Sequence, residues 1–134
     1  YNKHIIKNDK FNRTADIIVL CCPNTPETYH MVNEKTLGLM KKSAVLINPS
    51  RGGLVDTEAL YTALKNRQIA GAALDAYEEE PLLDSPLFEL DNILLTPHIG
   101  GLADKQIHDV AVQSAVNCGQ ALADSTEKLN MICG

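Results

Sequence analysis

Two residues, Arg51 and His98, have neighbours in the sequence that suit a catalytic or binding role. Arg51 is followed by Gly52 and Gly53, so the backbone can turn tightly there and nothing bulky crowds the guanidinium. A guanidinium in such a turn suits bidentate binding of a carboxylate. His98 follows Pro97 and precedes a glycine pair, and histidine is the side chain best placed to exchange a proton near neutral pH. Together they predict carboxylate binding and acid–base catalysis.

A run of three glutamates before Pro81 could supply a partner for that histidine. A carboxylate that hydrogen-bonds to the His98 ring would fix its tautomer and favour its protonated form. Acidic runs are usually solvated, and spacing alone does not choose among Glu78, Glu79 and Glu80. The remaining histidines lack a comparable setting and are interpreted as surface residues: His4, His30 and His108.

Four short apolar runs predict the strands that must position these residues. They are rich in β-branched or small residues, and three of them stop at a proline, which is typical of strands buried on both faces. The predicted strands cover residues 16–22, 44–48, 70–74 and 92–96.

Helical signals alternate with the strands. Helices are predicted at 33–41, capped by Asn33, at 56–64, capped by Asp56, and at 103–123, with an acidic loop at 78–86. The α/β alternation predicts a parallel sheet with helices on both faces, as in the second half of a Rossmann-type domain.

Polar residues follow the predicted strands directly. Cys22, Arg51, Asp75 and His98 each lie at or just beyond the carboxyl end of a different strand. Because parallel strands end at the same edge of a sheet, and open sheets bind ligands at that edge, these residues are expected to form one site.

Composition limits the classes of function. The chain has 134 residues, 12 Lys+Arg against 17 Asp+Glu, a formal net charge of −5 and 45% hydrophobic residues. This balance argues against nucleic-acid binding, and the longest apolar run, residues 17–22, is too short to span a membrane. The four cysteines, without zinc-ligand spacing, are interpreted as buried, reduced thiols of a cytoplasmic protein rather than disulfides or metal ligands: Cys21, Cys22, Cys118 and Cys133.

These motifs together resemble the D-isomer-specific 2-hydroxyacid dehydrogenases, the family of D-3-phosphoglycerate dehydrogenase and glyoxylate/hydroxypyruvate reductase. The resemblance covers most of residues 16–101 in the family's order. Its segments are CPNTPETYHMVN (22–33), LMKKSAVLINPSRGGLVDTEALYTAL (39–64), IAGAALDAYEEEPL (69–82) and NILLTPHIGG (92–101).

The resemblance implies a catalytic role for three residues. Arg51 matches the arginine that binds and polarises a 2-oxo acid. His98 matches the proton donor of the reduction, which acts as a base in the oxidation. Glu80, the glutamate directly before proline, matches the residue that orients the histidine.

The resemblance also implies a nicotinamide cofactor, NAD, with NADP not excluded. Cys22 would contact it through the backbone and Asp75 would hold its carboxamide. Arg51 and His98 would border the cofactor as well as the substrate. The remaining residues implied in cofactor binding are Pro49 and Ser50, along the riboside, and Gly100 and Gly101, which permit a close approach.

The G-x-G-x-x-G fingerprint of dinucleotide binding occurs nowhere in the chain. The family has it upstream, so residues 1–134 are interpreted as a partial NAD(P)-binding domain: its C-terminal half and the long helix that follows. The first βαβ half and the substrate domain are absent, and a start at Tyr1 rather than Met suggests a piece of a longer protein. The expected partners are a small 2-oxo or 2-hydroxy acid and, in the full-length protein, a second copy, with no nucleic acid or membrane.

Two alternatives to a dehydrogenase stay open at this point. One is an NAD(H)-sensing binding protein of the corepressor type, which shares this fold, although the absence of tryptophan from the chain counts mildly against it. The other is a fragment without independent activity, kept as a folding unit. Formate dehydrogenase, which has glutamine at the position of Glu80, is disfavoured by the glutamate.

Overall fold

The computed structural model describes residues 9–102 and 104–122, and for 104–106 and 120–122 the backbone only. His4 and Cys133 lie outside the described residues. The chain divides into two compact units, Tyr1–His98 and Ile99–Gly134. All the strands described belong to the first unit.

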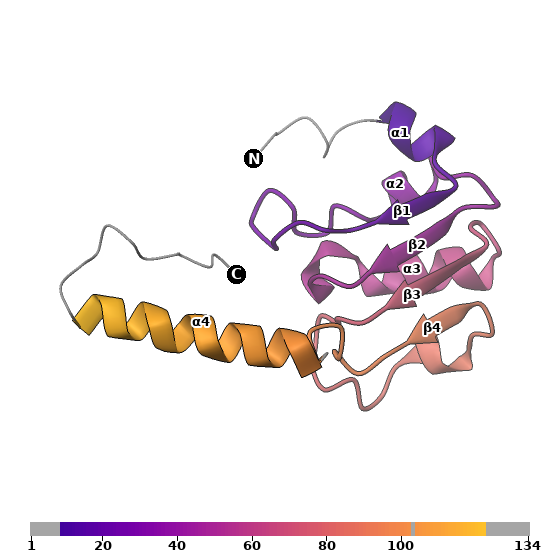
Figure 1. Ribbon diagram of the computed structural model, residues 1–134. Helices are drawn as coiled ribbons and strands as arrows, with labels where there is room; N and C mark the ends of the chain where they lie inside the picture. The colour runs from indigo at the N-terminus through magenta and orange to yellow at the C-terminus, as the bar shows by residue number, and fades with distance from the viewer. Residues whose placement is uncertain (1–8, 103, 123–134) are drawn as a thin grey trace. The chain divides into compact units, whose positions relative to one another are not determined.

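A four-stranded parallel sheet forms the centre of the first unit (Figure 1). Its strands lie side by side in sequence order, with Ile18 opposite Leu46 and Leu46 opposite Ala72. Each predicted strand is confirmed, in a shorter form: β1 (Ile17–Val19), β2 (Val45–Asn48), β3 (Gly71–Leu74) and β4 (Ile93–Leu95). The α/β fold class with a parallel sheet is therefore confirmed.

Two predicted helices connect the strands, and both predicted caps are present. In α2 (Glu34–Leu37), the Asn33 side chain accepts a hydrogen bond from the backbone N–H of Thr36. In α3 (Thr57–Lys65), the Asp56 side chain accepts one from Ala59 at 3.0 Å. Each cap satisfies an amide that the first helical turn leaves without a partner.

Short elements complete the first unit. They are α1 (Asp9–Thr14) and two single 3₁₀ turns, η1 (Gly52–Leu54) and η2 (Pro86–Glu89). The turn η1 directly follows Arg51, where the glycines predicted a tight turn, whereas α1 and η2 were not predicted. Runs of four to six residues carry too little periodicity to be recognised from sequence.

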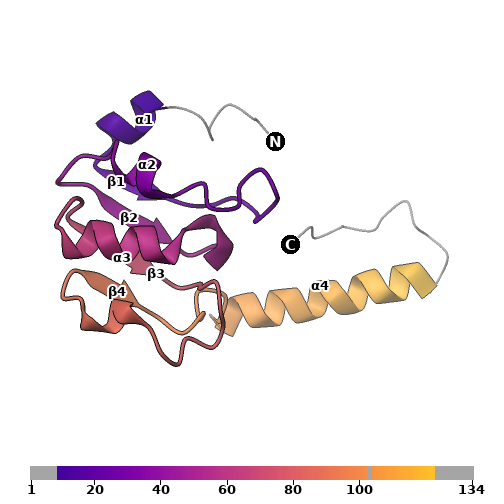
Figure 2. The same ribbon diagram turned by 180° about the vertical axis from the view of Figure 1, so that it is seen from behind.

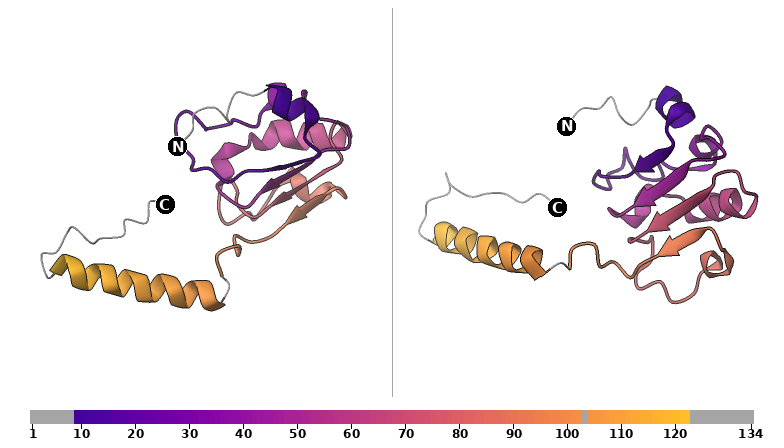
Figure 3. Two further views of the ribbon diagram at one scale, coloured as in Figure 1. Left: turned by 45° about the horizontal axis from the view of Figure 1, so that its top comes forward. Right: turned by 45° about the vertical axis from the view of Figure 1, so that its right-hand side comes forward.

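Helices α2 and α3 cover one face of the sheet, as the two opposite views show (Figures 1 and 2), and the oblique views agree on α3 (Figure 3). Apolar side chains from this face and from the helices form the core; those with 0% exposure include Leu37, Leu46, Leu60 and Leu64. On the opposite face Ile17, Val19 and Leu94 are 60%, 48% and 63% exposed. The expected burial of the strands on both faces is therefore not found within this unit.

The second unit contains the predicted long helix, α4 (Asp104–Leu122). Its apolar residues are about half exposed, among them Ile107, Val110 and Val116. No helix in the described part of the chain is both long and apolar enough to cross a bilayer.

Candidate active site

A buried asparagine, Asn48, hydrogen-bonds to the backbone of the turn that carries Arg51. Asn48, at the end of β2, is 1% exposed. Its amide nitrogen donates to the carbonyl of Arg51 at 2.8 Å, and its amide oxygen accepts from the backbone N–H of Ser50 at 3.1 Å. The sequence analysis missed this positioning residue; an asparagine that ends an apolar strand directly before a predicted site was the available signal.

The same turn packs against the loop that follows β3. A Cβ atom on Gly52 would lie 1.8 Å from the carbonyl carbon of Tyr77 and 2.3 Å from the backbone nitrogen of Glu78. Only glycine allows two backbones to approach this closely. Gly52 therefore lets the Arg51 turn lie directly against the loop that leads to Glu80.

Cys22 and Ser50 connect the loops that follow β1 and β2. The hydroxyl of Ser50 donates to the carbonyl of Cys22 at 2.8 Å, so the carbonyl predicted to face the cofactor also anchors a neighbouring loop. Burial, and then the nearby Cys21 thiol, raise the pKa of Cys22. The cysteines described, Cys21, Cys22 and Cys118, are free thiols. Cys21 and Cys118 are exposed and Cys22 is half-buried, so the expectation that these thiols are buried is wrong for Cys21 and Cys118.

Asp75 and Thr96 connect the ends of β3 and β4. Asp75 is 8% exposed, and its Oδ1 accepts a hydrogen bond of 2.6 Å from the hydroxyl of Thr96. The Tyr77 hydroxyl reaches the same two strand ends, donating to the carbonyl of Thr96 at 2.7 Å. Burial, and then the charge of Asp75, raise the pKa of Tyr77, so that it stays a neutral hydrogen-bond donor.

His98 and Glu80 form an ion pair beyond these strand ends. The ring Nδ1 lies 2.9 and 2.8 Å from the two carboxylate oxygens of Glu80. One of these oxygens also accepts from the backbone N–H of Tyr77 at 2.9 Å. That hydrogen bond first, and then the one from His98, hold the pKa of Glu80 below its ordinary value. Glu80 therefore stays ionised beside the His98 ring.

The backbone at His98 is unusual for a residue with a side chain. Its φ is 54°, in the left-handed region that residues other than glycine seldom adopt. Such a conformation costs free energy and persists where the surroundings impose it, often at functional sites. In this conformation Nδ1 of the ring meets the Glu80 carboxylate.

Arg51, Glu80 and His98 line one open pocket of about 480 Å³. This volume suits a small molecule or one end of a larger ligand. The rest of its lining comes from the same loops: Asn24, Tyr29, Gly52, Gly53, Tyr77 and Glu78. A second pocket, of about 450 Å³, shares Tyr77, Glu80 and His98, so the ion pair borders both.

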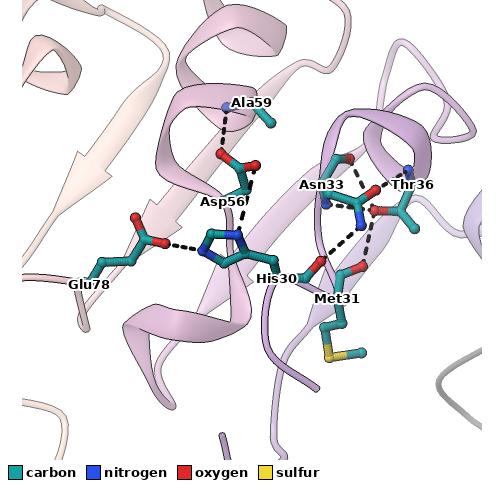
Figure 4. A network of polar contacts seen from close by, with 7 residues as sticks. All are labelled: His30, Met31, Asn33, Thr36, Asp56, Ala59 and Glu78. Carbon is teal, nitrogen blue, oxygen red and sulfur yellow. Dashed lines mark hydrogen bonds and ion pairs between the residues drawn. The ribbon is translucent and has the colours of Figure 1, made fainter. Parts of the chain in front are cut away.

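His30 is the one histidine of the first unit's described part that the sequence analysis placed wrongly. Its side chain is only 29% exposed, and its ring contacts the carboxylates of Glu78 and Asp56 (Figure 4). The interpretation as a surface residue is therefore incorrect. No signal within its own segment, PETYHMVN, indicates two carboxylates that come from distant loops.

Three further residues were predicted to bind the cofactor: Pro49, Gly100 and Gly101. Pro49 is exposed between Asn48 and Ser50, at the edge that carries the Arg51 turn. Gly100 and Gly101 belong to the second unit, and their role stays a prediction. Among the described residues, no group of three or more His, Cys, Asp or Glu side chains is arranged so that it could hold a metal ion.

Comparison with known proteins identifies the family of this chain. Residues 2–100 match the model of the D-isomer specific 2-hydroxyacid dehydrogenase family, NAD binding domain. The chain belongs to this family. For a D-isomer specific 2-hydroxyacid dehydrogenase domain, the parallel sheet and the loops at its carboxyl edge are the expected frame for a nucleotide cofactor.

Curated relatives of this 2-hydroxyacid dehydrogenase domain include two named enzymes. A glyoxylate reductase of Pyrococcus horikoshii is 59% identical over 88 residues, which are 66% of this chain and 26% of the relative. A D-3-phosphoglycerate dehydrogenase of a Synechocystis species is 45% identical over 130 residues, covering 86% of this chain and 24% of the relative. The chain thus spans about a quarter of the length of these relatives.

Solved structures show the same similarity of fold. The NADPH-dependent glyoxylate/hydroxypyruvate reductase of Sinorhizobium meliloti, in complex with NADP and malonate, has a TM-score of 0.84 at 31% identity, covering 92% of this chain and 38% of that one. The D-lactate dehydrogenase of Aquifex aeolicus, with NAD and lactic acid, has a TM-score of 0.82 at 32% identity, covering 89% and 40%. The dehydrogenase domain described here therefore shares its architecture with enzymes that bind either cofactor.

Proposed function

We propose that the protein containing this chain reduces a small 2-oxo acid to a D-2-hydroxy acid with a nicotinamide cofactor, and catalyses the reverse oxidation. The single observation that carries the proposal is the arrangement of the one pocket that Arg51, Glu80 and His98 line. An anion-binding group and a paired acid–base group next to each other are what the reduction of a 2-oxo acid requires.

Arg51 is proposed to bind the substrate carboxylate and to polarise the neighbouring carbonyl. Its side chain is exposed, and one guanidinium nitrogen donates to the carbonyl of Ser50 at 2.9 Å. That bond leaves most of its five N–H donors for a ligand. Asn48 and Gly52 hold the turn, so the guanidinium would meet the substrate with little loss of freedom.

His98 is proposed to donate the proton that the carbonyl oxygen gains on reduction. The protonated ring would give up the proton at Nε2, while Nδ1 stays bound to the Glu80 carboxylate. In the oxidation, the neutral ring takes the hydroxyl proton back. Glu80 is a positioning residue in this scheme, because it sets the orientation of the ring and stabilises its charged form.

The strand ends offer groups that fit the nicotinamide end of the cofactor. The Asp75 carboxylate and the Cys22 carbonyl are acceptors, which is what the two N–H bonds of a carboxamide need. Ser50 and Pro49 lie between them in the proposed riboside position. A bound nicotinamide cofactor supplies or accepts the hydride at C2 of the substrate, and these residues hold and orient it.

The remaining expectations are part of the same proposal. The cofactor is NAD, with NADP as the alternative, and the full-length protein is proposed to be a cytoplasmic homodimer with no nucleic-acid or membrane partner. The substrate is a 2-oxo acid of the size of glyoxylate or hydroxypyruvate, as the names of the relatives suggest.

Measurement of NADH and NADPH oxidation by the intact protein with glyoxylate, hydroxypyruvate and pyruvate tests this proposal. We expect Arg51→Ala to raise KM for the 2-oxo acid and lower kcat/KM about 10- to 100-fold, the effect of losing a charged hydrogen bond. The dissociation constant for NADH should barely change. Arg67→Ala is the matched control, because Arg67 pairs with Asp91 away from the pocket.

Failure of the intact protein to oxidise either cofactor with any of these acids would refute the proposed activity. A collapse of NADH binding in Arg51→Ala, with substrate kinetics unchanged, would instead make Arg51 a cofactor ligand.

A further inference from the structure

His30 occupies a position between the two loops that carry the proposed catalytic residues. Its backbone N–H donates to the carbonyl of Gly53 at 2.8 Å, two residues after Arg51. Its ring Nε2 contacts the carboxylate of Glu78, two residues before Glu80. One residue therefore bonds to the Arg51 turn through its backbone and to the Glu80 loop through its side chain.

The ring of His30 is held in one orientation from several sides. It stacks on Tyr29 with a centroid distance of 3.9 Å and an interplanar angle of 15°. Nδ1 lies 3.9 Å from Oδ2 of Asp56, whose other oxygen caps α3 (Figure 4). The backbone φ of His30 is 49°, so it shares the strained left-handed conformation of His98.

The loop that receives this contact also packs against Gly52, and the Tyr77 hydroxyl binds it to the ends of β3 and β4. Glu78, Glu79 and Glu80 are exposed residues of an irregular segment. The Glu80 carboxylate must keep its place against both the Tyr77 N–H and the His98 ring, at 2.9 and 2.8 Å. A displacement of about 1 Å at such a group can reduce a rate severely.

We propose that His30 is a positioning residue that, through its contact with Glu78, holds the loop of residues 77–80 where Glu80 can orient His98. This rests on the function proposed above. Because the side chain of His30 acts on the Glu80 loop while its backbone serves the Arg51 turn, replacing the side chain should disturb proton transfer and leave substrate anchoring intact.

The kinetic test compares variants of the intact protein. We expect His30→Ala to lower kcat about ten-fold with KM for the 2-oxo acid unchanged within about two-fold. His30→Gln, whose amide can donate to Glu78, should recover most of the rate. His30→Ala combined with Glu80→Gln should be no slower than Glu80→Gln alone, since residues that act through one another are not additive.

A second readout is independent of activity. Amide hydrogen exchange of the segment 77–80 should be faster in His30→Ala than in the wild type, and should return toward the wild-type rate in His30→Gln. His108→Ala is the control. The His108 side chain is 76% exposed and its Nδ1 lies 3.6 Å from Oδ1 of Asp109, so this variant also removes a histidine next to a carboxylate, but in another part of the chain.

Unchanged hydrogen exchange of residues 77–80 in His30→Ala would overturn the inference, even if the protein proved inactive toward 2-oxo acids. Two outcomes would mean that His30 only stabilises the fold. One is an effect of His30→Ala that adds in full to that of Glu80→Gln. The other is a fall in kcat with an equal rise in KM that His30→Gln does not rescue. An inactive wild type with the expected exchange pattern would refute the proposed function and keep the positioning role.

Discussion

Nδ1 of His98 and Oε2 of Glu80 are 2.8 Å apart, although 18 positions separate the two residues in the chain. The contact exists because β3 and β4 are adjacent and parallel, so the loops that follow them leave the sheet at the same edge. It is also shared with the backbone, since the Tyr77 N–H binds the same carboxylate at 2.9 Å. The charge that faces the imidazole is thereby fixed in position.

The first prediction concerns the charge of Glu80 in the proposed reaction. Glu80→Gln keeps the size of the side chain and a hydrogen-bonding group but removes the charge that faces Nδ1 of His98. We expect kcat/KM to fall about ten-fold in both directions, with KM for the 2-oxo acid little changed, because the His98 ring loses the charged partner that orients it. The measurement is kcat and KM in both directions for the intact protein.

The neighbouring variant Glu79→Gln provides a matched control, because Glu79 is exposed in the same loop. An unchanged kcat/KM in Glu80→Gln would remove Glu80 from the pair and return Glu78 and Glu79 as candidates.

The second prediction concerns stability in acid. The pKa of Glu80 lies below its ordinary value, so its ionised form stabilises the native state above that ordinary value, and the contribution disappears as the pH falls through the native pKa. The difference in free energy of unfolding between wild type and Glu80→Gln should therefore shrink as the pH is lowered from 6 to about 3. Urea titrations at several pH values measure it; a constant difference would contradict the pairing.

The third prediction concerns the close approach at Gly52. In Gly52→Ala, the new Cβ meets the backbone of Tyr77 at 1.8 Å, so one of the two loops must move. We expect a loss of about 1–3 kcal/mol in the free energy of unfolding, together with a large fall in kcat/KM. Gly119→Ala is the control, because a Cβ there meets nothing within 4 Å and alanine favours a helix. Equal stability of the two variants would show that the loops are not in contact.

The fourth prediction concerns the 134-residue chain by itself. It contains no G-x-G-x-x-G sequence, and the pyrophosphate-binding helix N-terminus supplies much of the affinity for a dinucleotide. We expect a dissociation constant for NADH in the millimolar range or weaker, which corresponds to about −4 kcal/mol. Calorimetric titration of the chain beside the intact protein checks this, and micromolar binding by the chain would contradict it.

Parts of the fold were predictable because their signals are local. The strands β1, β2, β3 and β4 are short apolar runs with clear ends, and the caps at Asn33 and Asp56 act within one helical turn. The elements that were missed are the helix α1 and the turn η2, which are too short for periodicity. The sheet face that carries Ile17 and Leu94 was expected to be buried but is exposed. An apolar run does not show which of its two faces the same chain covers.

The amino-acid sequence by itself determined the class of chemistry: a guanidinium beside glycines, a histidine between proline and glycine, and a parallel sheet whose strand ends bring them to one edge. Spacing left three glutamates equivalent, and the family resemblance selected Glu80 among them. The sequence placed His30 on the surface and indicated no role for Asn48. The contacts of all three residues appear only in the tertiary structure, because they join loops that are distant in the chain. Glu80 meets His98, and Glu78 meets His30 next to the point where Gly52 packs against the backbone of Tyr77 and Glu78. No local sequence pattern encodes these contacts.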